Sequence, residues 1–175
     1  DHLAGVASFQ SAVERQAVNF ARKHLNFDFS IVFYDLTTLY FETFGEDKLR
    51  KCGFSKDNKN NQPQVLIALV VNQDGFPIKC QMFEGNTFEG HTMLPLLREL
   101  KKEHQIETLT VVADAAMLSL SNIQLLEEES FSYIVAARMA SLPNTLLEEI
   151  SGSLNTTEGK YESRQTNYGK LICDY

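Results

Sequence analysis

The chain has 175 residues and a mass of 19.8 kDa, with 43% hydrophobic and 22% charged side chains. This size and balance indicate a folded core and exclude a disordered or fibrous protein. The formal net charge of −7 excludes a protein that coats DNA by charge alone, but not an acidic catalytic core. The longest apolar run, residues 65–71, is too short to cross a bilayer, so we expect no membrane partner.

The three cysteines, Cys52, Cys80 and Cys173, are far apart in the sequence and form no CxxC pair. This pattern predicts reduced thiols in the cytoplasm rather than a disulfide framework or a zinc site. The chain begins without methionine, shows no signal peptide and stops directly after a strand-like run. We therefore expect a piece of a longer cytoplasmic protein.

Residues 1–30 predict a helical lead-in that comes from an upstream domain. Apolar side chains recur there at steps of three and four residues, which gives one stripe along a helix. The stripe consists of Val6, Phe9, Val13, Ala17 and Phe20.

Residues 31–36 predict a central strand, because both alternating faces are apolar except at Asp35. A long polar segment, 42–64, follows and is predicted to be a functional or disordered loop. Residues 65–71 and 77–83 predict the strands of a hairpin, since Asp-Gly between two such runs is typical of a tight turn.

The second half of the chain alternates helices and strands. A helix is predicted at 92–103 and a strand at 109–113, and Ser121 with Gln124 forms a capping box that predicts the start of the next helix. The later elements are a strand at 132–137, a short helix at 144–150 and a hairpin of 160–166 with 170–174.

This order predicts an α/β fold with a mixed sheet. The hairpin makes the second strand antiparallel to the first. A helical crossover then places the fourth strand beside the first and parallel to it. Asp35 and Asp114 would stand on these two neighbouring strands, close enough to share one cation.

Asp35 and Asp114 are the candidate metal ligands. A carboxylate within an apolar strand is costly unless it has a partner or a function. Two such acids at strand ends match the preference of Mg²⁺ for a couple of carboxylates plus water and phosphate oxygens. Each acid also has a structural alternative: Asp35 could cap a turn with Thr37 and Thr38, and Asp114 could be a helix N-cap.

Two segments are candidates for contact with DNA. Residues 48–59 carry five basic side chains and one acid, and the basic ones include Arg50, Lys51 and Lys56. Neighbouring acids offset most of this charge, so a solvated loop is the favoured alternative. In the turn after the hairpin, Asn86 and Thr87 could touch a substrate, although an ordinary turn is favoured there too.

Several stretches together resemble the DDE transposases of bacterial insertion sequences. The resemblance covers residues 31–175 and is carried by 33–42, 49–57, 74–77, 84–87 and 111–118, in this order. It implies an RNase H-like core, a mixed five-stranded sheet flanked by helices, that cuts and joins DNA with two divalent metal ions, Mg²⁺ or Mn²⁺. It also implies DNA as the partner, both element ends and target, and a homodimer of the full-length protein in the bacterial cytoplasm, associated with the nucleoid.

The resemblance assigns roles to both acids. Asp35 and Asp114 match the first and second catalytic acids of the family, which hold the metal ions. The third, a glutamate, would lie beyond Tyr175, so residues 31–175 are expected to be a catalytic core truncated before its last catalytic helix and inactive alone. Ala116 stands where the family usually has glycine.

Other classes fit less well. A truncated or degenerate transposase fragment, acting only as a binding module, shares the fold and stays open as the alternative. A phosphatase with an aspartate nucleophile needs a second aspartate two residues after the first, where this chain has Thr37. Thr37 also disagrees with the pattern of an actin-like ATPase.

Overall fold

A computed structural model describes residues 2–43, 45–54, 61–114, 119–136, 143–145, 148, 161–166 and 169–174. The chain divides into two compact units, Asp1–Ala136 and Ala137–Tyr175. In the second unit, β6 (Tyr161–Thr166) and β7 (Gly169–Asp174) form an antiparallel hairpin, as predicted. Among the helices so described, none is long and apolar enough to span a membrane.

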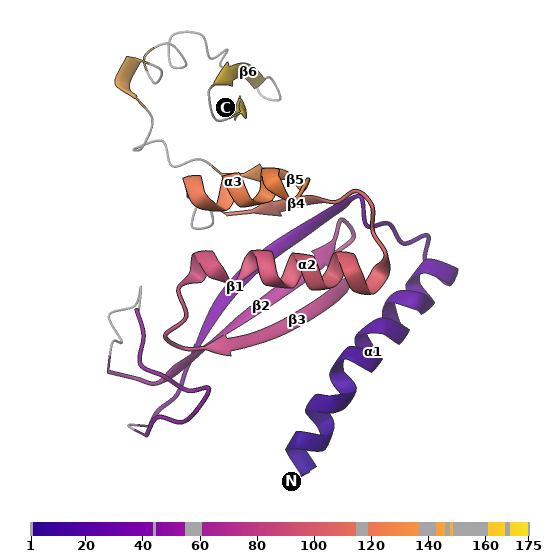
Figure 1. The fold of residues 1–175 in the computed structure, drawn as a ribbon, viewed down its shortest axis with the longest axis vertical. Coiled ribbons are helices and arrows are strands. Elements are labelled where there is room, and N and C mark those ends of the chain that lie inside the picture. Colours follow the sequence, from indigo (N-terminus) through magenta and orange to yellow (C-terminus); the bar gives the residue numbers. More distant parts are fainter. Residues whose placement is uncertain are drawn as a thin grey trace. The chain divides into compact units, whose positions relative to one another are not determined.

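The first unit is built on one five-stranded sheet in the order β3-β2-β1-β4-β5 (Figure 1). Its strands are β1 (Ile31–Tyr40), β2 (Gln64–Asn72), β3 (Pro77–Glu84), β4 (Thr110–Ala113) and β5 (Ser132–Val135). Strand β2 is antiparallel to β1 and β3, whereas β4 is parallel to β1 and β5. This is the mixed, RNase H-like sheet that was expected, and the predicted position of the fourth strand beside the first is confirmed.

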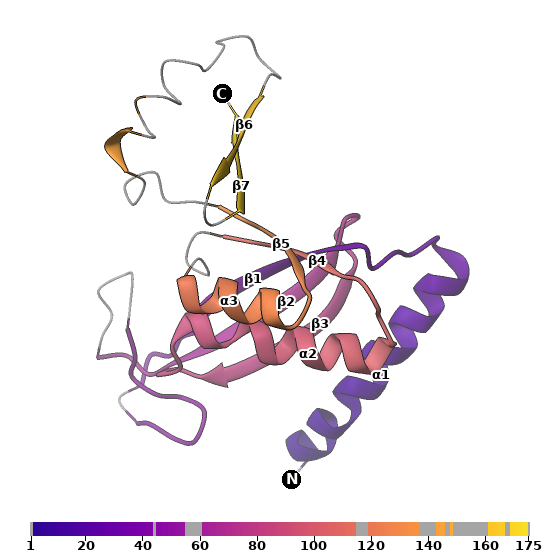
Figure 2. The same ribbon diagram turned by 45° about the horizontal axis from the view of Figure 1, so that its top comes forward.

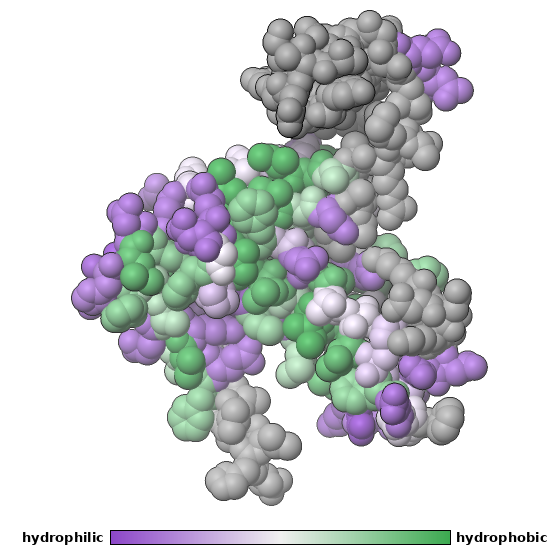
Figure 3. Space-filling view, turned by 180° about the vertical axis from the view of Figure 1, so that it is seen from behind, coloured by the Kyte–Doolittle hydropathy of each residue, from purple (hydrophilic) through white to green (hydrophobic). Residues whose placement is uncertain are grey.

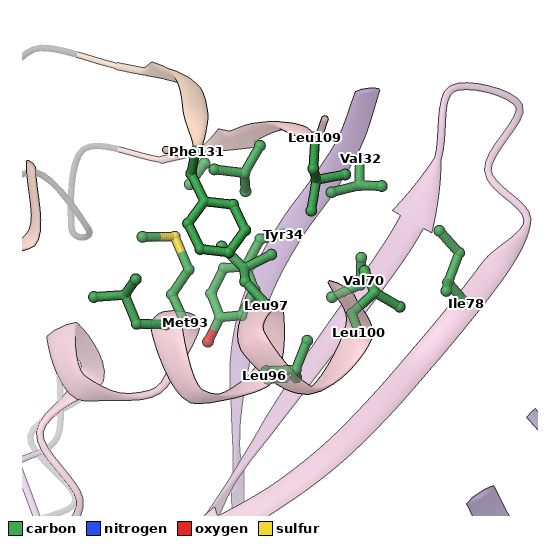
Figure 4. Packing of buried hydrophobic residues seen from close by; sticks show 14 of the residues in the cluster. Val32, Tyr34, Val70, Ile78, Met93, Leu96, Leu97, Leu100, Leu109 and Phe131 are labelled. Atoms are coloured by element: carbon green, nitrogen blue, oxygen red, sulfur yellow. The ribbon is translucent and has the colours of Figure 1, made fainter. Parts of the chain in front are cut away.

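Helices α2 (Met93–His104) and α3 (Leu120–Glu128) lie together over one face of this sheet, as the two ribbon views agree (Figure 2). Leu96, Leu97 and Leu100 of α2 are fully buried against Val32 and Val70 of the sheet (Figure 4). Each such side chain contributes about 1.5–3 kcal/mol by leaving water. This layer fixes the positions of β1 and β4, on which the candidate site depends.

The N-cap of helix α3 lies two residues before the predicted one. Ser119 is the N-cap, and its hydroxyl accepts a hydrogen bond from the backbone N–H of Asn122 at 3.1 Å. The expected capping box of Ser121 and Gln124 is therefore wrong. Two serines stand close together here, and only the packing of α3 decides which of them ends the preceding loop.

Helix α1 (His2–His24) is present as predicted, but its apolar stripe does not face the sheet. Phe9, Val13 and Phe20 are 64%, 65% and 57% exposed, whereas Val18 and Ala21 are buried. The reason is that α1 docks through polar side chains on the free edge of β3, a contact that hydrophobic periodicity does not reveal.

Strand β1 is four residues longer than its predicted end at residue 36, because Thr37 to Tyr40 continue to pair with β2. Asp35 consequently lies in the middle of a strand. The alternative in which Asp35 caps a turn with Thr37 and Thr38 is therefore wrong.

Candidate catalytic site

The two candidate acids belong to neighbouring parallel strands: Asp35 lies within β1, and Asp114 directly follows β4. Strands β1 and β4 pair Ile31 with Thr110 and Phe33 with Val112, where the pairing ends. The same register, if continued two residues further, would set Asp35 opposite Asp114. Neighbouring strands are about 4.8 Å apart, so two carboxylates at one register position can reach a common ion.

Both acids belong to the sheet face that α2 and α3 leave open. Side chains alternate along a strand, and the residues before them, Tyr34 and Ala113, are buried on the helix-covered side. Asp35 and Asp114 are exposed. Figure 3, which views the molecule from behind, shows a band of hydrophobic side chains over this open face. The large exposed residues of the face are Phe33, Leu39, Leu69, Met82 and Ile134.

The pKa of the buried Tyr34 hydroxyl is affected by the carboxylates around it. Burial, and to a smaller extent the negative charges of Asp35, Glu89 and Asp114, raise the pKa of Tyr34 to about 12, while its hydrogen bond to Thr92 acts in the opposite direction. Three carboxylates therefore act on one hydroxyl. Such a concentration of negative charge favours the binding of a cation nearby.

The loop between β3 and α2 is tied to the strand that carries Asp35. The buried Thr92 hydroxyl donates to the Glu89 carbonyl at 2.6 Å, so the Tyr34 hydroxyl is the donor in its 2.6 Å contact with Thr92 Oγ1. From α3, the Asn122 amide donates to the Gly90 carbonyl at 2.9 Å. These contacts hold the loop next to β1 and α3, and the sequence alone gave no signal for them.

The candidate DNA contacts Arg50 and Lys51 lie in an ordered part of the long polar segment. Lys51 pairs with Gln64 through its backbone, and the Arg50 side chain bonds to Asp47 at 2.7 Å. Hydrogen bonds from Arg50 and Leu49 lower the pKa of Asp47 to about 2. The Arg50 guanidinium also lies over the Phe41 ring, 5.4 Å from its centroid, so this side chain is held in place.

The other candidate contacts lie elsewhere. Asn86 is exposed and Thr87 is half-buried in the turn after β3, where the Thr87 amide bonds to the Glu84 carbonyl at 2.9 Å. Lys56 and Ala116 fall outside the described residues. The structure thus places Asp35 on β1 and Asp114 at the end of the neighbouring β4, and the remaining described candidates in separate loops.

Two glycines that sequence analysis did not single out close the long segment onto the sheet. A Cβ atom at Gly53 would overlap the Gly85 carbonyl, and one at Gly85 would overlap the Gln64 and Lys51 carbonyls. The Gln64 amide donates to the Gly85 carbonyl at 2.8 Å. The only signal in the sequence was the presence of glycine itself, which allows such close approach.

Asp35 and Asp114 offer the kind of ligand atoms that a divalent cation requires. Two exposed carboxylates at one register position fit a hard ion such as Mg²⁺ or Mn²⁺, which takes oxygen ligands and keeps several waters. In the part of the chain that the structure describes, no group of three or more His, Cys, Asp or Glu side chains could hold a metal. Asp35 and Asp114 therefore fit a partial site that water and phosphate oxygens would complete.

Two solved structures show a distant likeness to this chain. It is similar to a piggyBac transposase synaptic complex with hairpin DNA, with 14% identity and a TM-score of 0.46 over 90% of this chain and 35% of that one. It is also similar to a Mos1 transposase paired-end complex with the left transposon end, with 13% identity and a TM-score of 0.41 over 83% of this chain and 54% of that one.

The chain thus spans only about a third to a half of these solved chains. A comparison with curated proteins gives no match. The family model described as "Transposase DDE domain" matches residues 26–169, which is most of the chain. The chain therefore belongs to the transposase DDE domain family.

Proposed function

We propose that this chain is part of a DDE transposase that cuts and joins DNA strands during transposition of a bacterial insertion sequence. The observation that carries the proposal is the parallel pairing of β1 with β4, whose register, if continued, would set Asp35 opposite Asp114. Family membership supports the same reaction class, which is phosphoryl transfer.

Asp35 and Asp114 would hold the divalent cations through their exposed carboxylates. When bound, two such ions activate a water for attack on a phosphodiester and stabilise the leaving oxygen. The chain's own contribution is positioning: the β1–β4 pairing sets the spacing of the acids, and the Tyr34–Thr92 hydrogen bond holds the adjacent loop. Arg50 and Lys51, on the ordered segment next to β2, would neutralise DNA phosphates.

The complete active site would need a third carboxylate. We propose that it is a glutamate that follows Tyr175 in a longer protein, which acts as a homodimer on element ends and target DNA in the bacterial cytoplasm. The chain alone would then be inactive. The alternative is that the chain belongs to a truncated or degenerate transposase that acts only as a binding module. In that case the longer protein would not cleave DNA either.

Strand cleavage by the full-length protein tests this proposal. Asp35→Asn and Asp114→Asn each remove one ligand charge with little change of shape, so each should abolish nicking of supercoiled plasmid that carries the element ends, in Mg²⁺ or Mn²⁺. Asp74→Asn is the matched control: Asp74 is exposed in the hairpin turn at the opposite edge of the sheet, and Asn-Gly suits that turn equally well.

Thermal melts of all three variants establish that they fold. The proposal expects the control to nick at the parent rate. If Asp35→Asn or Asp114→Asn nicked at the parent rate while folding normally, that acid would have no role in the metal site.

A further inference from the structure

An exposed aromatic ring stands in the loop between β3 and α2. Phe88 is 65% exposed, although phenylalanine is among the residue types most often buried. Strands β1, β3 and β4 run in the same direction, so this loop leaves the sheet at the end toward which β1 and β4 also run (Figure 1). The loop that carries Phe88 therefore follows the same end of the sheet as Asp114 does.

The Phe88 ring is held against the backbone of its own loop. A Cβ atom at Gly90 would lie 2.7 Å from Phe88 Cε1, so the ring lies directly against this glycine. The ring meets His91 edge to face, with 5.1 Å between centroids. The His91 amide bonds to the Phe88 carbonyl at 2.9 Å, which closes the turn around the ring. Because the ring is already fixed, binding through it costs little conformational entropy.

The loop itself is anchored from two directions, by the Asn122 amide at Gly90 and by the Thr92 hydroxyl at Glu89. Thr92 also accepts the hydrogen bond of Tyr34, the residue directly before Asp35. The loop is thus tied to β1, the strand that carries Asp35, and to α3, the helix that follows Asp114 in the chain.

The surroundings of Phe88 suit a nucleotide base better than a hydrophobic partner. The ring is flanked by exposed polar side chains, Asn86 and His91, which can hydrogen-bond to a base edge or a sugar. The large exposed apolar residues of the open sheet face lie on the strands, whereas Phe88 lies in a loop, apart from them. A single aromatic face with polar neighbours is the arrangement by which proteins stack unpaired bases.

Resting on the proposed function, we propose that Phe88 stacks on the base of an unpaired nucleotide at the DNA end that is being processed. His91 supports the ring, and Asn86 contacts the same nucleotide. Stacking of this kind is worth about 5- to 150-fold in affinity per base. This contact would hold the DNA strand at a fixed distance from Asp35 and Asp114. The paired part of the duplex would bind to Arg50 and Lys51.

The chain contains no tryptophan, so a single substitution supplies a specific reporter. Phe88→Trp places an indole in the loop, and Phe9→Trp is the matched control because Phe9 on α1 is 64% exposed. Each variant is titrated at low salt, without divalent ions, with a single-stranded oligonucleotide, a blunt duplex of the same sequence, and the single strand with abasic sites. Low salt is needed because the net charge of −7 opposes phosphate binding.

Phe88→Trp fluorescence should be quenched by the single strand and much less by the blunt duplex or the abasic strand, and Phe9→Trp should respond to none of them. Phe88→Ala, tested by competition, should bind the single strand about 5- to 150-fold more weakly and the duplex unchanged. Phe88→Leu should behave like alanine, since it retains apolar bulk but lacks a π face. Absence of quenching, equal quenching by all three DNAs, or an unchanged affinity of Phe88→Ala would overturn the proposal.

The failure of this proposal can be told apart from failure of the proposed function. No divalent ion is present, so the quenching of Phe88→Trp is measured independently of the metal site. If stacking is absent while Asp35→Asn still abolishes nicking, only the role of Phe88 is lost. If stacking is present while Asp35→Asn nicks normally, the metal site is wrong and the base contact stands.

Discussion

Lys79 shows how single residues secure the unit that carries the site. Its side chain is only 5% exposed, and its Nζ lies 3.1 Å from Glu99, 3.2 Å from Glu103 and 3.7 Å from Glu14. Burial alone would lower the pKa of Lys79, but hydrogen bonds to Glu99 and Glu103 outweigh it and raise the pKa. The carboxylates come from α1 and α2, so this one ammonium joins both helices to β3.

Lys79→Met should destabilise the fold by about 1–3 kcal/mol at pH 7, because Glu14 and Glu99 lose this cation and Glu103 keeps only its pair with Arg15. Burial raises the pKa of Glu103, but Lys79 lowers it more, so Glu103 stabilises the parent above its unfolded pKa and less as pH falls through its folded pKa. The deficit of Lys79→Met, measured by urea unfolding, should therefore shrink toward pH 4. Lys102→Met, on the exposed side of α2, is the control, and a deficit independent of pH would contradict the ion-pair explanation.

Gly85 is the residue on which closure of the long polar segment depends. Gly85→Ala forces its Cβ into the Gln64 and Lys51 carbonyls, so the backbone must shift, at a cost of about 1–3 kcal/mol. Gly45→Ala should be close to neutral, since the nearest atom there would be 3.8 Å away. Thermal melts compare the two variants. Equal melting temperatures would show that the close approach at Gly85 carries no stability.

Helix α1 acts at the scale of an element by covering the free edge of β3. The Gln10 amide donates to the Cys80 carbonyl at 2.6 Å, and the Cys80 N–H donates to Glu14 Oε1 at 3.0 Å. These side chains take the place of a further strand. An open edge strand is a template for aggregation, so this contact protects the sheet as well as stabilising it.

The double variant Gln10→Ala/Glu14→Ala should speed hydrogen exchange of the Cys80 amide and cost about 1–3 kcal/mol, because it leaves edge groups unpaired. Phe9→Ala/Val13→Ala, on the exposed stripe of the same helix, should leave that exchange rate unchanged. Exchange measured by mass spectrometry on the β3 peptide distinguishes the two. Protection of Cys80 that survived loss of Gln10 and Glu14 would mean that α1 is not the cover of this edge.

The elements differ in how far local sequence determines them. The Asp74-Gly75 turn and the alternating runs around it predicted the hairpin, and two strand–helix crossovers predicted β4 beside β1, the two strands that carry or precede Asp35 and Asp114. The docked face of α1 was not predictable, because polar contacts with Cys80 outweigh its apolar stripe. The anchored loop at Phe88 was missed for a similar reason: Thr92, Tyr34 and Asn122 are far apart in sequence, and only packing unites them.

At the scale of the whole unit, the two faces of the sheet have different roles. One face carries α2, α3 and the core, which fixes the strands. The other face is open, rich in exposed apolar side chains, and contains both candidate acids (Figure 3). A site on this face can admit a large polymer such as DNA, while the covered face keeps the β1–β4 register that sets the distance between Asp35 and Asp114.

The central claim is that Asp35 and Asp114 form one cation site, and localised cleavage by bound iron tests it most directly. Fe²⁺ that replaces Mg²⁺ generates hydroxyl radicals, in the presence of ascorbate and peroxide, which cut the backbone beside the ion. We predict cuts near residue 35 and near residue 114 together, both suppressed by excess Mg²⁺, both lost in Asp35→Asn and both retained in Asp74→Asn. Cuts at only one of the two places, or cuts that persist in Asp35→Asn, would contradict it.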